Sequence, residues 1–69
     1  MECIKHRHDS WNNLTLAGRT VGVAIDQNAT IFNLPTNSTI LVNGESVDRS
    51  YIIREGDTIE LVGETGQKG

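Results

Sequence analysis

The dipeptide Asn43-Gly44 constrains the fold of this chain more than any other feature of its sequence. It stands between the apolar residues 40–42 and Val47. A type I′ hairpin turn needs positive φ at both central residues, and asparagine followed by glycine meets that need best. We therefore expect two antiparallel strands, residues 39–42 and 45–47, joined by this turn. Residues 58–62 form another clear strand pattern, with Ile59 and Leu61 on one face.

Before the hairpin, the apolar pattern changes its period at Thr20. The apolar residues that follow are spaced like one face of an amphipathic helix, at Val21, Ala24, Ile25, Ala29 and Phe32. Thr20 is a suitable N-cap, and Pro35 ends any helix at or before Leu34. The β-branched residues among 21–25 leave a strand there as the competing interpretation.

The other segments are shorter and less regular. Residues 13–17 alternate like a half-buried strand, and residues 51–53 form another short apolar element. Residues 1–10 are mostly polar and are expected to be an edge strand or a frayed terminus. One helix packed on a small mixed sheet is an α+β arrangement. The expected core is Leu16, Val21, Ile25, Phe32, Ile40, Val42, Ile59 and Leu61.

Size and composition limit the function classes. A chain of 69 residues is at most one small domain, and its single cysteine excludes an internal disulfide. Its net charge of −3 argues against binding nucleic acid through phosphate contacts. The apolar runs are too short for a membrane span or signal peptide, so we expect no membrane association and a cytoplasmic location. A catalytic cleft needs several hundred Å³, which favours a carrier or binding module over an enzyme.

The last seven residues differ from the rest. Residues 63–69 contain no apolar side chain, whereas residues 1–62 hold every expected strand and the helix. We therefore expect a folded domain over residues 1–62 and a flexible C-terminal tail over residues 63–69.

The second half of the chain resembles a known family. Residues 40–45, Val47 and residues 54–62 are similar to the C-terminal half of the ThiS/MoaD-like sulfur-carrier proteins. The resemblance covers about thirty residues, in which an Asn-Gly-Glu turn is followed by a Gly-Asp that leads into a strand. It implies a ubiquitin-like β-grasp fold, with one helix across a small mixed sheet.

The resemblance also implies a role for the tail. In that family an ATP-dependent, ubiquitin-activating-type enzyme adenylates the terminal glycine carboxylate, which then becomes a thiocarboxylate or, in modifiers, a thioester and an amide. That carboxylate corresponds to Gly69, and Gly66 adds flexibility. The family ends in Gly-Gly, whereas Lys68 precedes Gly69 here. Either the partner enzyme has a wider, acidic channel, or this chain is a β-grasp interaction module that is not activated. Neither role needs a cofactor or a catalytic group of its own.

Three residues are candidates for partner binding. Trp11 is either an interface anchor or a cap on one end of the core. Glu60 and Glu64, together with Asp57, make an acidic surface that is usually just solvated and that in a carrier would suit docking onto a basic activating enzyme.

Two further hypotheses carry less weight. Val42-Asn43-Gly44, Val47, Ser50-Tyr51, Gly56-Asp57 and Ile59 are also similar to the hairpin of a small RNA-binding domain of ribosomal proteins and pseudouridine synthases. Six acidic residues against two arginines in residues 45–64 would repel phosphate there. His6 and His8 would share a metal if both lay on one strand, with only Cys3 and Asp9 nearby, so we expect no metal site.

Overall fold

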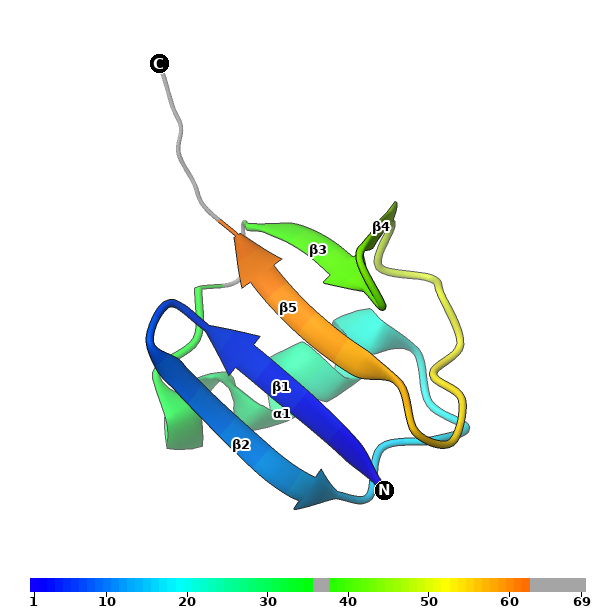
Figure 1. The fold of residues 1–69 in the computed structure, drawn as a ribbon, viewed down its shortest axis with the longest axis horizontal. Coiled ribbons are helices and arrows are strands. Elements are labelled where there is room, and N and C mark those ends of the chain that lie inside the picture. Colours follow the sequence, from blue (N-terminus) through cyan, green and yellow to red (C-terminus); the bar gives the residue numbers. More distant parts are fainter. Residues whose placement is uncertain (36–37, 63–69) are drawn as a thin grey trace.

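The computed structural model describes residues 1–35 and 38–62 as one helix and a five-stranded mixed sheet, which confirms the expected α+β class. The elements are β1 (Glu2–His6), β2 (Asp9–Leu14), α1 (Val21–Phe32), β3 (Thr39–Val42), β4 (Glu45–Val47) and β5 (Thr58–Val62). The strands lie in the order β2-β1-β5-β3-β4. α1 crosses one face of this sheet, as Figure 1 shows.

β1 corrects the expectation for residues 1–10. This segment is neither an edge strand nor frayed, because β1 lies inside the sheet, antiparallel to β2 and parallel to β5. The side chain of Ile4 is fully buried against the helix. A single large apolar side chain is enough to place this segment inside the sheet, because β5, which is distant in the sequence, pairs with it. The predicted strand over residues 13–17 is largely misplaced, because β2 runs from Asp9 to Leu14 and residues 15–17 are not part of a strand.

α1 begins and ends close to the predicted positions, and the competing strand over residues 21–25 is wrong. The Oγ1 of Thr20 accepts a hydrogen bond from the backbone N–H of Val23 at 3.3 Å, which caps the first turn. Asn33 ends the helix in a left-handed conformation, with φ 57°. The stop precedes Pro35, as the sequence predicts.

The expected hairpin is confirmed. Val42 pairs with Glu45 across the two-residue turn, in which Asn43 has φ 54° and Gly44 has φ 88°. These values are typical of a type I′ turn. The apolar residues 51–53 do not form a strand: Ile52 makes a single antiparallel bridge with Thr20.

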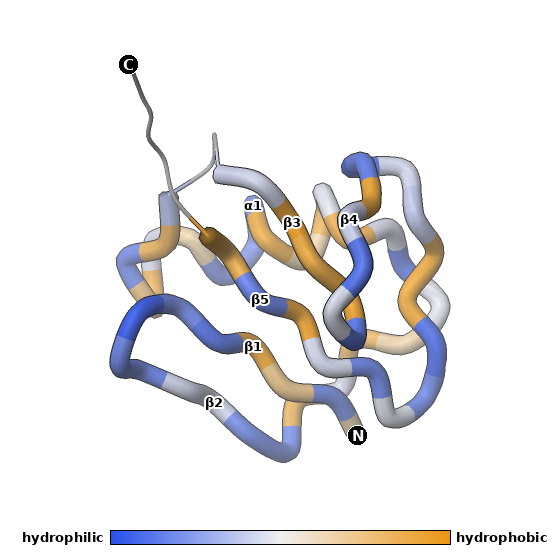
Figure 2. Tube along the Cα trace, turned by 45° about the horizontal axis from the view of Figure 1, so that its top comes forward, coloured by the Kyte–Doolittle hydropathy of each residue, from blue (hydrophilic) through white to orange (hydrophobic). Residues whose placement is uncertain are grey.

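The core lies between α1 and the sheet. All the predicted core residues are buried except Phe32, which is half-buried. The sequence-based prediction missed Ile4, Ala24, Leu34 and Ile53. Figure 2 shows apolar colour along β3 and in the middle of β1, whereas β2 is mostly hydrophilic. A polar edge strand of this kind discourages pairing with another sheet. Within the described ranges, no helix has the length and hydropathy needed to cross a membrane.

Candidate functional site

The whole expected carrier terminus lies outside the described residues. Gly66, Lys68, Gly69 and the neighbouring Glu64 all belong to residues 63–69, so their roles stay predictions. The strand that leads to them in sequence is β5, which ends at Val62.

The end of β5 is held on both sides. Leu61 pairs with His6 of β1, and Val62 pairs with Thr39 of β3. In Figure 1 the orange tip of β5 lies between the blue β1 and the green β3. The last described residues are therefore a firmly positioned part of the sheet.

Glu60 occupies the centre of the sheet face that is turned away from α1. The strand register places one row of residues across all five strands on this face: Ser10, Lys5, Glu60, Leu41 and Ser46. We call these residues the open-face row. All are exposed except Leu41, which is half-buried. Because Lys5 and Glu60 carry opposite charges at paired positions, the row is polar without being strongly acidic.

The expected acidic surface is wrong as far as Asp57 is concerned. Asp57 is only 6% exposed, and it precedes β5 at the end of the strand opposite to Val62. Its carboxylate accepts hydrogen bonds inside the fold and is not presented to a partner. Glu60 remains exposed on the open face.

Trp11 lies on the other face of the sheet. It pairs with Ile4 in the register of β1 and β2, and its indole stacks on the ring of Phe32 at 4.5 Å between centroids and 14° between planes. Both side chains are half-buried against the core. This position matches the expectation that Trp11 caps one end of the core, and its role as a partner anchor stays a prediction.

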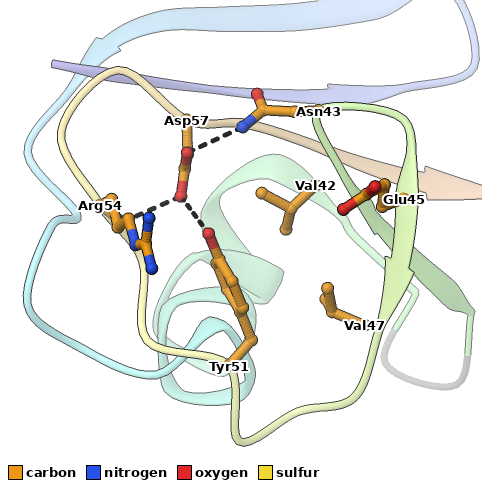
Figure 3. A pocket seen from close by; sticks show the side chains of 7 residues that line it. All are labelled: Val42, Asn43, Glu45, Val47, Tyr51, Arg54 and Asp57. Carbon is orange, nitrogen blue, oxygen red and sulfur yellow. Dashed lines mark hydrogen bonds between the residues drawn. The ribbon is translucent and has the colours of Figure 1, made fainter.

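A hollow of about 470 Å³ lies between the β3–β4 hairpin and the loop that precedes β5. It is lined by Val42, Asn43, Glu45, Val47, Tyr51, Arg54 and Asp57. Figure 3 shows Asp57 and Tyr51 on one side of this hollow, with Val42, Val47 and Glu45 on the other.

Asp57 ties the two sides together. Its Oδ2 accepts hydrogen bonds from the hydroxyl of Tyr51 at 2.8 Å and from the backbone N–H of Arg54 at 2.9 Å. Its Oδ1 accepts one from the Nδ2 of Asn43 at 2.9 Å, and the Oδ1 of Asn43 in turn accepts one from the backbone N–H of Thr58 at 3.0 Å. We call Asn43, Tyr51 and Asp57 the hairpin latch, because they join the turn to the loop (Figure 3).

The latch sets the protonation of its members. Burial raises the pKa of Asp57, but the hydrogen bonds from Arg54, Tyr51 and Asn43 lower it by more, so the pKa lies below the ordinary value. The pKa of Tyr51 is raised, chiefly because its hydroxyl donates to Asp57 and then because of burial. At neutral pH the carboxylate is therefore ionised and the phenol keeps its proton. The two groups are hydrogen-bonded to each other, and this arrangement suits a structural network better than proton transfer.

A second buried carboxylate lies near the latch. The side chain of Glu2 is almost fully buried. Its Oε1 accepts hydrogen bonds from the backbone N–H groups of Leu16 at 2.7 Å and Ala17 at 2.9 Å, and its Oε2 accepts one from Gly56 at 3.0 Å. The bonds from Leu16 and Gly56 lower the pKa of Glu2 from 4.5 to about 2, although burial opposes the change. Glu2 thus joins two loops to the first strand.

The histidine pair does not form a metal site. β1 ends at His6, and Arg7 has φ 58°, so His8 lies in the turn to β2 and not on the same strand. Over residues 1–35 and 38–62, no three potential ligands come together in a way that suits a metal ion. Cys3 is half-buried on β1, next to Thr58 in the register.

Sequence reasoning found the turns but not the polar side chains that hold them. It explained Asn43 by turn geometry alone, placed Asp57 in a turn and on an acidic surface, and treated Glu2 as part of a polar terminus. No local signal marked Asp57 for burial, because its side-chain partners Asn43 and Tyr51 come from other segments. No local signal existed for Glu2, because its partners come from distant loops.

Comparison with known proteins does not assign this chain to a family. No protein-family model matches it, and no curated protein does. The fold defines a small α+β protein with one helix on a five-stranded mixed sheet. Its function is therefore argued from its own residues.

Proposed function

We propose that this chain is a ubiquitin-like β-grasp protein that acts as a sulfur carrier or protein modifier, and that the carboxylate of Gly69 is adenylated by an ATP-dependent enzyme. The observation that supports the proposal is the arrangement of the elements. A single helix lies across a mixed sheet whose central strands, β1 and β5, are parallel (Figure 1). The resemblance to ThiS/MoaD-like carriers implies an arrangement of this kind.

The position of β5 suits this role. It is a central strand, paired with β1 up to Leu61 and with β3 up to Val62. Residues 63–69 add seven positions to the sequence, which span at most roughly 25 Å when extended. A carboxylate at Gly69 would then reach an enzyme while β5 stays in the sheet. The groups that react with the nucleotide would all come from that enzyme.

The chemistry needs no catalytic group from the carrier. The Gly69 carboxylate attacks the α-phosphate of ATP, and pyrophosphate leaves. A sulfur donor bound to the enzyme then displaces the adenylate to give a thiocarboxylate. Lys68 departs from the family pattern, and we expect an acidic group of the partner enzyme to accept its positive charge.

The test uses the purified chain with ATP and candidate adenylating enzymes. ATP–pyrophosphate exchange that depends on the chain, followed by a mass increase of about 16 Da with a sulfur donor, supports the proposal. Deletion of Lys68 and Gly69 abolishes both signals, whereas Ser46→Ala on the open-face row retains exchange as a matched control. Lys68→Gly shows whether the lysine slows the reaction. An absence of exchange with every candidate enzyme contradicts the proposal.

The alternative is a β-grasp interaction module that is not activated. The open-face row favours it, because this mostly exposed polar surface crosses all five strands. Partner binding that survives deletion of residues 63–69 but is weakened by Glu60→Lys identifies this role. Trp11→Leu, which keeps an apolar group against Phe32, tests whether the indole anchors a partner on the opposite face of the sheet.

A further inference from the structure

Asn43 combines a reactive sequence with a protective structure. An asparagine followed by glycine is open to attack by the next backbone nitrogen, because glycine has no side chain to hinder the approach. Gly44 is the residue that follows Asn43 here, and it occupies the second position of the two-residue turn with φ 88°. The sequence Asn43-Gly44 therefore favours a spontaneous reaction of the asparagine side chain, which the folded structure can slow.

The reaction is deamidation. The backbone nitrogen of Gly44 loses its proton and attacks Cγ of Asn43, and the bond from Cγ to Nδ2 breaks as ammonia leaves with that proton. The resulting five-membered succinimide is opened by water at either carbonyl. One product is aspartate at position 43, and the other is isoaspartate, in which the chain continues through the former side chain. No oxidant, reductant or enzyme is needed.

In the folded chain the hairpin latch holds the Asn43 amide away from this attack. Nδ2 donates to Asp57 at 2.9 Å, and Oδ1 accepts from the backbone of Thr58 at 3.0 Å (Figure 3). The backbone N–H of Asn43 also donates to the carbonyl of Thr58 at 2.9 Å. To bring Cγ over the nitrogen of Gly44, the side chain must rotate and break both of its hydrogen bonds.

We propose that Asn43 is a deamidation site that the latch protects, and that its modification opens the latch irreversibly. The inference is independent of the proposed carrier function, because it depends only on the turn and its hydrogen bonds. The rate of deamidation depends on how often the hairpin opens, because the amide reacts only in the fraction of molecules in which the latch is open.

The product does not fit back into the latch. Aspartate at position 43 replaces an amide donor with a carboxylate at the position that lies 2.9 Å from the carboxylate of Asp57, which is buried. Two carboxylates so close repel each other. Isoaspartate adds one backbone atom to a two-residue turn and distorts the pairing of Val42 with Glu45 beside it. Either product releases the hairpin from the loop that carries Tyr51.

The test compares deamidation rates in two solutions at the same pH and temperature. The chain is kept in buffer or in concentrated urea, and the mass increase of about 1 Da is localised to residue 43 by peptide mapping. We expect the folded chain to react at least about tenfold more slowly than the unfolded chain, because the latch must open first. Equal rates in buffer and urea overturn the proposal.

Two variants separate the latch from general stability. Asp57→Asn takes the acceptor away from the Nδ2 of Asn43, and we expect it to speed deamidation of the folded chain, with circular dichroism used to verify that it stays folded. Ser46→Ala in the adjacent strand leaves the rate unchanged. If Asp57→Asn stays folded and reacts no faster than the wild-type chain, the latch is not the protecting element. Asn43→Asp mimics one product, and melting at the wild-type temperature would show that modification does not open the latch.

Discussion

Two buried carboxylates hold the same end of the sheet by different means. Glu2 accepts hydrogen bonds only from backbone N–H groups, those of Leu16, Ala17 and Gly56. Asp57 accepts from two side chains, Tyr51 and Asn43, and from one backbone N–H. For both carboxylates, the hydrogen bonds outweigh the burial that would neutralise them.

The difference lies in what the partners can do when the acid is lost. Backbone N–H groups in a fixed loop cannot turn away, and the N–H of Leu16, which is buried, is left without an acceptor. The hydroxyl of Tyr51 and the amide of Asn43 rotate, and both are close enough to the surface to reach water. A buried donor without a partner destabilises the fold by its full desolvation penalty, whereas a donor that can reach water destabilises it much less. Removal of Glu2 is therefore expected to do more harm than removal of Asp57.

Among the polar substitutions, the largest effect is expected for Glu2→Gln. The amide keeps one acceptor oxygen but presents an NH₂ group to a backbone N–H that it cannot bond. We expect the melting temperature to fall by roughly 10 °C or more, in a domain of this size. Calorimetry checks this, with Glu60→Gln at an exposed position of β5 as the control. A melting temperature within the error of the wild-type value would break the comparison.

The acid sensitivity of the fold should follow from Glu2. Its pKa is about 2 in the folded chain against an ordinary value of 4.5, so the unfolded chain binds the proton first as pH falls. The stability that this carboxylate contributes is complete above about pH 4.5 and is lost towards pH 2. Asp57 acts in the same direction, because its pKa is also lowered.

Urea unfolding at a series of pH values measures this dependence. Glu2→Gln should flatten the curve between about pH 4.5 and pH 2 relative to the wild-type chain, because the titrating group is gone. A wild-type curve that is already flat over this interval would show that the three backbone hydrogen bonds do not hold the carboxylate in its ionised form.

A smaller effect is expected for Asp57→Asn. Its Oδ1 can still accept from Tyr51 and Arg54, but its NH₂ group then faces the NH₂ group of Asn43. Asn43 cannot turn over without losing its bond from Thr58. We expect the melting temperature to fall by roughly 5 °C, and by less for Tyr51→Phe, which removes one donor and leaves the acid intact. A greater loss for Tyr51→Phe than for Asp57→Asn would reverse the assigned order.

The smallest effect is expected on the open face. Glu60→Gln removes an exposed charge beside Lys5 and should change the free energy of unfolding by no more than about 0.5 kcal/mol. Ile4→Ala, on the buried face of the same sheet, should cost about 2–5 kcal/mol. Urea titration compares the two faces. Strong destabilisation by Glu60→Gln would mean that the open face is part of the stabilising structure and not a free surface.

Local patterns in the sequence determined the elements with regular geometry. The Asn43-Gly44 turn, the Thr20 cap and the alternation of Ile59 and Leu61 each act over a few residues, so their outcome was readable from spacing alone. The α+β class followed from the order of these elements.

Only the tertiary structure decided which polar residues became internal. β1 looked like a loose terminus because its burial depends on β5, which lies more than fifty residues away in the sequence. Glu2 and Asp57 carry no local mark of burial, since the N–H groups and side chains that compensate their charge come together only when the strands and loops are assembled. Hydrophobic periodicity predicts which face of a helix or strand is buried. Whether a charged group can remain buried depends on long-range hydrogen bonds, which periodicity does not show.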